Sequence, residues 1–179
     1  VTVEGIRPEF FGSFLDILQE MGLSVSSTES SVTAKSNGRL KAVHVKTLPF
    51  PGLATDLQAP LMAALTVAEG TSTIEETIYE GRFGHASELA RMGARIKIAD
   101  RTVTIDGVER LAGAPVDGLD IRAAAALVLA ALAAEGRSEI HELHHLRRGY
   151  EHVEKKLGAL GARVWSRVSD PDDFIFAGC

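Results

Sequence analysis

The sequence predicts a mixed α+β fold in which short β-sheets surround buried central helices. Two observations support this. A block that opens with an aspartate and closes with Glu-Gly occurs twice, at 56–70 and 120–136. The stretch inside each block is apolar on almost every side, as expected of a helix in an interior. Because short β-type runs follow each block, we expect the helices at the centre and the sheets outside.

The composition is that of one ordinary domain. The chain has 179 residues, 45% of them apolar and 24% charged, which is enough for a real core. A net charge of −5 argues against partners such as nucleic acid or an anionic membrane, which need a basic surface. The longest apolar run, 123–134, is too short to span a bilayer. With one cysteine and no signal-peptide pattern at the N-terminus, we expect a soluble cytoplasmic protein.

The repeat can be followed beyond the central blocks. A β-type run comes next, at 71–78 and at 137–143. Arg82 and Arg148 then lie 13 residues past the glutamates of the two Glu-Gly pairs. Each arginine leads into an amphipathic helix and a β pair, clearest at 94–98 and 102–105. This order predicts two β-α-β-α-β-β units, at 42–108 and 109–179.

A partial unit is predicted at residues 1–41. Phe10, Phe14, Ile17 and Met21 recur at helical spacing, and only the short strand 1–3 precedes them. The first strand and first helix of the unit are therefore not recognised. We expect residues 1–179 to form a single domain.

Four charged residues mark the ends of the repeated elements. Asp56 and Asp120 stand where a helix N-cap is expected, and the glycine of each Glu-Gly pair stands where a C′ glycine is expected. The loops at these helix N-termini should bring both aspartates and both repeat arginines to a common rim. Since helix N-termini favour anions, a phosphate or carboxylate site is predicted there.

Four linked motifs carry a resemblance to a known family. They are Ala-Thr-Asp-Leu-Gln-Ala at 54–59, Glu-Gly-Arg-Phe-Gly-His at 80–85, Asp-Ile-Arg-Ala at 120–123 and Arg-Gly-Tyr-Glu at 148–151. From about 41 to 164 the chain resembles the second domain of the enolpyruvyl transferases. The resemblance implies two domains of three units each, with the active site between them. The first domain is not recognised here, so we expect the isolated chain to be inactive.

The resemblance also implies a reaction. The enolpyruvyl group of phosphoenolpyruvate would pass to the 3-hydroxyl of UDP-N-acetylglucosamine, a step of peptidoglycan synthesis, in a monomer without a required cofactor. Asp56 would accept the hydroxyl proton, which requires an ionised carboxylate. Arg148 would hold the carboxylate of phosphoenolpyruvate with its planar fork. Further residues implied in substrate binding are Ile78, along the nucleotide through its backbone, and Arg82, Asp120 and Arg122, around the rim.

Other interpretations stay open. Asp56 could merely cap a helix beginning at Leu57, Ile78 could be a strand core residue, and the rim charges could be ordinary ion pairs. The chain could belong to a sister enzyme, 5-enolpyruvylshikimate-3-phosphate synthase, or be a non-catalytic binding or regulatory module. Two departures from the family pattern bear on this: Arg147 replaces a usual aspartate, and Gly81 a usual asparagine.

One segment formally matches a zinc-binding pattern. The segment 141–145 reads His-Glu-Leu-His-His and matches the zinc-protease pattern, which requires both histidines on one helix face. The repeat places this segment on a strand that runs into a loop, where neighbours point to opposite sides. Cys179 lies in no context that matches the family's cysteine general acid. No metal is expected.

Overall fold

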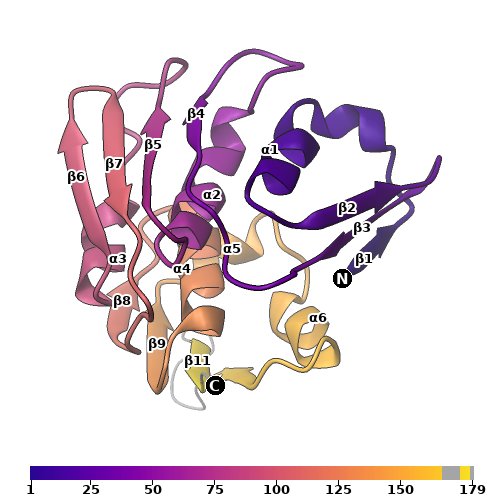
Figure 1. Cartoon of the computed structure of the whole chain (residues 1–179). Coiled ribbons are helices and arrows are strands. Elements are labelled where there is room, and N and C mark those ends of the chain that lie inside the picture. The colour runs from indigo at the N-terminus through magenta and orange to yellow at the C-terminus, as the bar shows by residue number, and fades with distance from the viewer. Residues whose placement is uncertain (167–173, 178–179) are drawn as a thin grey trace.

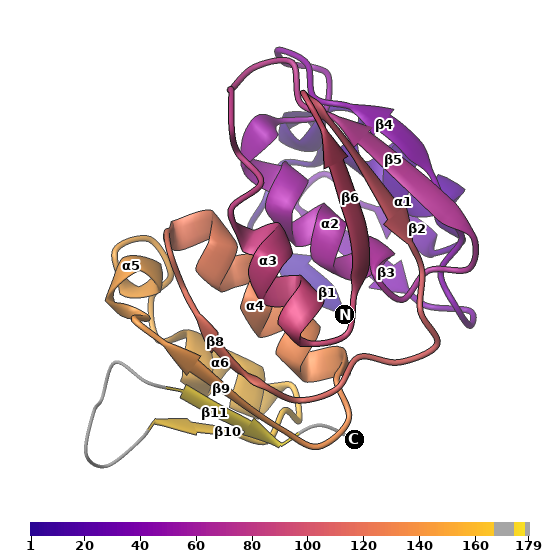
Figure 2. The same cartoon turned by 90° about the vertical axis from the view of Figure 1, so that its left-hand side faces the viewer.

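The computed structural model describes residues 1–166 and 174–177. Three small sheets in this part of the chain surround two central helices (Figure 1). The order of elements follows the predicted repeat, and Figure 2 shows the two central helices side by side between the sheets. The predicted fold class is confirmed.

The middle unit, between 42 and 108, has the full β-α-β-α-β-β order. Its sheet runs β4-β5-β7-β6, with β4 and β5 parallel and the other pairs antiparallel. A 3₁₀ turn, η2, precedes its central helix α2. The elements are β4 (His44–Lys46), η2 (Thr55–Leu57), α2 (Gln58–Leu65), β5 (Thr71–Glu75), α3 (His85–Arg91), β6 (Arg95–Ala99) and β7 (Thr102–Asp106).

The described residues of the last unit repeat this order and include one added short helix. Its sheet runs β10-β11-β9-β8, and β8 pairs with β9 in parallel as β4 pairs with β5. The elements are β8 (Pro115–Asp117), α4 (Ile121–Ala133), β9 (Arg137–His141), α5 (His144–Arg147), α6 (Val153–Ala159), β10 (Val164–Ser166) and β11 (Phe174–Ala177).

The first unit has a three-stranded sheet, β1-β3-β2, and one α-helix. The single helix expected over 10–21 is wrong at its start, because the chain turns at Gly12 with φ +52 beneath the Pro51 carbonyl. Phe10 is consequently exposed, whereas Ile17 and Met21 are buried. The elements are β1 (Thr2–Glu4), η1 (Pro8–Phe11), α1 (Phe14–Glu20), β2 (Ser24–Ser27) and β3 (Ser31–Lys35).

The central helices α2 and α4 pack against each other, as predicted from their apolar character. Leu127 of α4 is fully buried and Leu132 is partly buried. Leu129, expected inside with them, is 43% exposed. One face of the central pair is therefore open.

Of the two aspartates predicted to cap the central helices, only Asp120 does so. Asp120 caps α4, accepting hydrogen bonds from the backbone N–H of Arg122 (2.7 Å) and Ala123 (3.0 Å). Asp56 caps nothing, because it lies inside η2 and α2 begins after it without a side-chain cap. Gly70 and Gly136 have positive φ but are not C′ residues, since both helices end earlier.

Three smaller expectations can be placed. The 141–145 segment is a strand end followed by Glu142 in a left-handed conformation and by α5, rather than a strand and a loop. No described helix is long and apolar enough to cross a membrane. Cys179 lies outside the described residues.

Candidate functional site

The predicted site residues meet at the edge where the parallel strands β4 and β5 end. Because both strands end on the same side of the sheet, the loops that follow them come together there. Asp56 lies on η2 after the first loop, and Arg82 lies in the second loop, just before α3. Arg122 joins them from the first turn of α4, so the cluster spans both complete units.

Asp56 is held through one of its two oxygens. Arg82 Nη1 donates to Oδ1 at 3.1 Å, and Arg122 Nε donates to the same oxygen at 2.5 Å. Within the described part of the chain no hydrogen bond engages Oδ2. The side chain is 64% exposed, so this oxygen is available to a ligand.

Both arginines keep this carboxylate ionised. The hydrogen bond from Arg122 lowers the pKa of Asp56 most, partial burial opposes it, and the charges of Arg122 and Arg82 add to the lowering. The pKa therefore lies below its ordinary value. At neutral pH, Asp56 can accept a proton, as the interpretation of this residue as a base requires.

Arg82 is fixed on several sides. Its Nη1 also donates to Thr55 Oγ1 at 2.7 Å, and its guanidinium lies over the Tyr79 ring, 4.3 Å from the centroid. Only 17% of the side chain is exposed. This arginine is part of the frame that orients Asp56.

Glu76 is a site residue that sequence reasoning missed. It is fully buried directly after β5 and accepts hydrogen bonds from two threonines, Thr47 and Thr55, and two backbone N–H groups. A signal was present, because alternation along the strand places Glu76 on the same face as the buried Ser72 and Ile74. A carboxylate on the inner face of a strand indicates a built polar network.

A pocket of about 510 Å³ lies beside this cluster. Asp120, Ile121, Arg122, His145 and Arg148 line it. Three predicted binding residues are therefore brought together, and Arg122 contributes to both the pocket and the Asp56 cluster. Within the described residues the Arg148 side chain makes no hydrogen bond or ion pair, so its fork can receive an anion.

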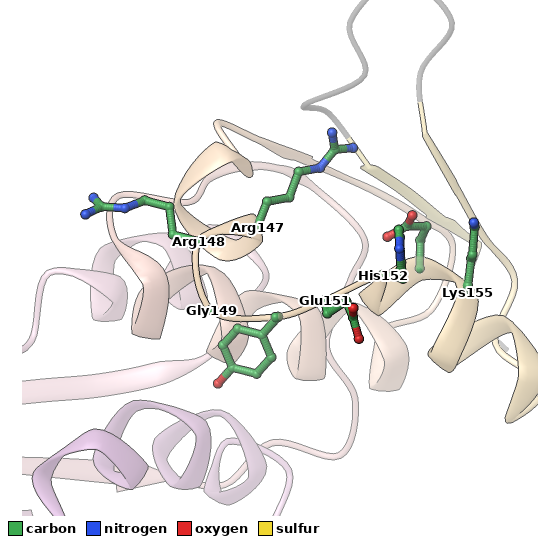
Figure 3. A pocket seen from close by; sticks show the side chains of 8 residues that line it. Arg147, Arg148, Gly149, Glu151, His152 and Lys155 are labelled. Carbon is green, nitrogen blue, oxygen red and sulfur yellow. The ribbon is translucent and has the colours of Figure 1, made fainter.

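A second hollow, of about 630 Å³, lies on the other side of Arg148, between α5 and α6. Figure 3 shows the side chains of Arg147 and Arg148 leaving the end of α5 in different directions. The Arg147 guanidinium lies 5.5 Å from the centroid of the Phe174 ring. The extra charge of Arg147 is thus directed away from the pocket that holds Asp120 and Arg122.

The two remaining sequence features lie on the loop after β5. Ile78 is 41% exposed, and its backbone N–H donates to Glu76, so it is not a strand core residue. Gly81 has φ +70 with open space around its missing side chain. Since asparagine also tolerates this conformation, the departure at Gly81 leaves the backbone of the loop unchanged.

The described residues form no group of three or more His, Cys, Asp or Glu side chains that could hold a metal ion. His144 and His145 instead have their rings against each other, 4.0 Å between centroids. The charged side chains in and beside the Asp56 cluster are the carboxylates of Asp56 and Asp120 and the guanidinium groups of Arg82, Arg122 and Arg148.

Comparison with known proteins decides the family. Residues 1–157 match the family described as EPSP synthase (3-phosphoshikimate 1-carboxyvinyltransferase). The chain belongs to the EPSP synthase family. Within this family it is similar to proteins named UDP-N-acetylglucosamine 1-carboxyvinyltransferase. The one from Ruegeria pomeroyi is 52% identical over 165 residues, and the one from Rhodopseudomonas palustris is 49% identical over 170.

These matches cover most of the chain but only part of each relative. They span 92% and 94% of this chain and 39% of either relative. Among solved structures, the enolpyruvyl transferase NikO from Streptomyces tendae is 33% identical, with a TM-score of 0.81 over 90% of this chain and 38% of its own. An EPSP synthase from Acinetobacter baumannii, at 20% identity and a TM-score of 0.68, shows the shared fold.

Proposed function

We propose that this chain is part of a longer protein, termed the whole protein below, that transfers the enolpyruvyl group of phosphoenolpyruvate to the 3-hydroxyl of UDP-N-acetylglucosamine. One observation carries the proposal. Asp56 is an ionised carboxylate with one oxygen held by two arginines and the other open to a ligand, beside a pocket that contains the unengaged Arg148. A base and an anion receptor are thus adjacent.

The chemistry assigns each group one task. The sugar oxygen forms a bond to the central carbon of the enolpyruvyl group, the bond from that carbon to the phosphate oxygen breaks, and phosphate leaves. Oδ2 of Asp56 takes the hydroxyl proton, while Arg148 holds the carboxylate of phosphoenolpyruvate. Asp120, Arg122 and Arg82 set the charge of the rim, and the backbone of Ile78 lies along the nucleotide.

The names of the relatives support the choice of acceptor. The two relatives near 50% identity are named for UDP-N-acetylglucosamine, whereas the Acinetobacter baumannii EPSP synthase is 20% identical. We therefore favour the amino-sugar nucleotide over shikimate 3-phosphate. The product would enter peptidoglycan synthesis in the cytoplasm, and we propose a monomer that needs neither nucleic acid nor membrane.

We propose that the whole protein contains the first strand and first central helix of the partial unit 1–41. The domain would then consist of three units, the other two being 42–108 and 109–179. In the middle unit, α3 packs on α4, the central helix of the next unit. The helix α6 has the same length as α3, and its Val153 and Leu157 stand where α3 has the buried His85 and Leu89. We propose that α6 likewise packs on a central helix, that of the first unit.

An apolar groove supports this proposal. It measures about 340 Å³ and lies between α2, α4 and α6, where such a helix would fall. Its lining includes Leu57, Val128, Leu129, Val153 and Leu157. A first domain, which would supply the remaining catalytic groups, is proposed in addition. Leu129→Asp should therefore destabilise the whole protein more than the 179-residue chain, measured by urea unfolding.

The assay is phosphate release from phosphoenolpyruvate, with UDP-N-acetylglucosamine or shikimate 3-phosphate as acceptor. We expect turnover by the whole protein with the amino-sugar nucleotide only, and none by the 179-residue chain alone. Turnover with shikimate 3-phosphate would instead assign the whole protein the activity of a 5-enolpyruvylshikimate-3-phosphate synthase. Tight binding of both substrates without phosphate release would instead establish the non-catalytic module.

A further inference from the structure

Glu76 joins the two loops that carry the site. Its Oε1 accepts hydrogen bonds from Thr47 Oγ1 (2.7 Å) and from the backbone N–H of Ile78 (2.8 Å) and Tyr79 (3.0 Å). Its Oε2 accepts one from Thr55 Oγ1 at 2.8 Å. Thr47 and Thr55 flank the loop between β4 and α2, and the backbone donors belong to the loop after β5.

The carboxylate also fixes the polarity of the Thr55 hydroxyl. An ionised carboxylate only accepts, so the single Thr55 proton must point to Glu76. A lone pair of Thr55 Oγ1 is then left for Arg82 Nη1, 2.7 Å away. The same guanidinium group donates to Asp56 Oδ1. A continuous path therefore runs from Glu76 through Thr55 and Arg82 to Asp56.

Glu76 is ionised despite its burial. Burial raises the pKa of Glu76, but the hydrogen bonds from Thr47, Tyr79, Thr55 and Ile78 outweigh this, and the pKa lies below its ordinary value. Burying a charge is costly unless it is fully hydrogen-bonded. The four donors meet that requirement.

The last unit shows that the fold itself does not require this carboxylate. Glu142 follows β9 as Glu76 follows β5, but Glu142 is exposed and has φ +58. The positions of Thr47 and Thr55 are taken there by Gly118 and Leu119, which have no hydroxyl. The same strand pairing and the same kind of central helix form without the network.

We propose that Glu76 is a positioning residue of the transferase: through the Thr55 hydroxyl it holds Arg82 against Asp56. The inference rests on the proposed function, in which Asp56 is the base. It assigns the buried carboxylate to the geometry of the reaction and not to the stability of the sheet.

Glu76→Gln in the whole protein is a sharp test, because the amide is nearly the same shape. Its oxygen can keep the three bonds of Oε1, while its NH₂ group faces Thr55 and reverses the direction of that hydrogen bond. We expect kcat to fall by about tenfold, the size for disturbing one hydrogen bond to a charged group, with KM for both substrates little changed. Glu142→Gln is the matched control and should leave kcat unaltered.

Thr55 variants test the path even where the glutamine variant folds poorly. Thr55→Val should reproduce the loss of kcat, and Thr55→Ser, which keeps the hydroxyl, should restore it. In the double variant Glu76→Gln with Thr55→Val, the loss should be no larger than in Thr55→Val alone. Losses that multiply would show that Glu76 acts by another route and overturn the proposal.

A titration separates this inference from the proposed function. Carboxyl NMR of the whole protein should show a higher pKa for Asp56 in Glu76→Gln than in Glu142→Gln, because a displaced Arg82 no longer helps to lower it. If the wild-type whole protein transfers no enolpyruvyl group, the proposed function fails and this titration still decides the role of Glu76. An Asp56 pKa identical in the two variants would reject the inference.

Discussion

The middle and last units share an element order but use equivalent charges in opposite ways. Arg82 is bound by Thr55, Asp56 and the Tyr79 ring, whereas Arg148, at the same place in the repeat, has no partner among the described side chains. Asp56 binds arginines, and Asp120 caps a helix. One unit thus holds a carboxylate in a fixed position, and the other leaves a cation available to an incoming anion.

This difference has a local cause. The loop between β4 and η2 covers 47–54, whereas only 118–120 separate β8 from α4. The longer loop brings Thr47 and Thr55 over the strand end, where Glu76 can bind both. The shorter loop leads directly to Asp120, which caps α4. Loop length therefore decides which aspartate caps a helix and which one binds two arginines.

The largest expected effect is on catalysis. In the whole protein, Asp56→Asn should lower kcat by ~10²–10⁴, because the amide keeps the shape but accepts no proton. Binding of UDP-N-acetylglucosamine, measured by calorimetry, should be largely retained. A variant with near wild-type turnover would remove Asp56 as the base and leave only its ion pairs.

The second effect concerns stability against acid. His85 is buried at the start of α3, and no described residue forms a hydrogen bond with its Nε2, whereas Val153 takes this place in α6. Burial lowers the pKa of His85 to about 4, and the nearby Asp120 opposes this. The unfolded histidine binds its proton near pH 6.5. The contribution of neutral His85 to the free energy of unfolding is therefore fully present above that pH and is lost as the pH falls towards 4.

The loss should reach about 3 kcal/mol at pH 4, measured by urea unfolding across this range. His85→Gln has no titrating group at this place and serves as the comparison. The variant should show a flatter dependence between pH 6.5 and 4, whatever its stability at pH 7. Parallel curves for the two proteins would show that folding does not lower the pKa of His85.

The third effect separates the two arginines. Arg148→Ala in the whole protein should raise KM for phosphoenolpyruvate by roughly 10- to 100-fold, the range for a lost charge-assisted hydrogen bond. Its melting temperature should change little, because no described residue forms a hydrogen bond or ion pair with this side chain. Arg82→Ala should lower kcat and the melting temperature together. If Arg82→Ala raised only KM and Arg148→Ala lowered kcat and the melting temperature, Arg82 would be the substrate-binding arginine and Arg148 the structural one.

Much of this arrangement could be predicted from the sequence, because the repeat is carried by apolar helices whose burial is compulsory. The same repeat predicts that Asp56, Arg82, Asp120 and Arg148 lie at one rim, and the family resemblance adds Arg122, although the roles of all five stay predictions. The predictions that failed concern residues whose contacts are made by side chains distant in the sequence. Local pattern made Asp56 a cap, but two arginines distant in sequence hold its side chain instead.

Further misses have the same origin. Phe10 fits the helical period, but Gly12 turns the chain before it can join α1. Leu129 is as apolar as its buried neighbours and is exposed because no element of the described chain covers the groove. Glu76 could not be recognised as a buried site residue from its own strand alone. Its partners Thr47 and Thr55 lie about 20 to 30 positions earlier in the sequence, at the start of the loop 47–54 and directly after it.

The smallest effect distinguishes the two aspartates by stability alone. Asp120→Ala removes the hydrogen bonds to the N–H groups of Arg122 and Ala123, and should lower the free energy of unfolding by about 1 kcal/mol. Asp120→Asn keeps the cap and should be nearly neutral. Asp56→Ala loses only ion pairs of an exposed side chain, so its cost should stay below ~0.5 kcal/mol. Urea unfolding of the three variants at pH 7 gives the comparison. An equal loss for both alanine variants would mean that Asp56 supports its helix after all, and the contrast between the units would disappear.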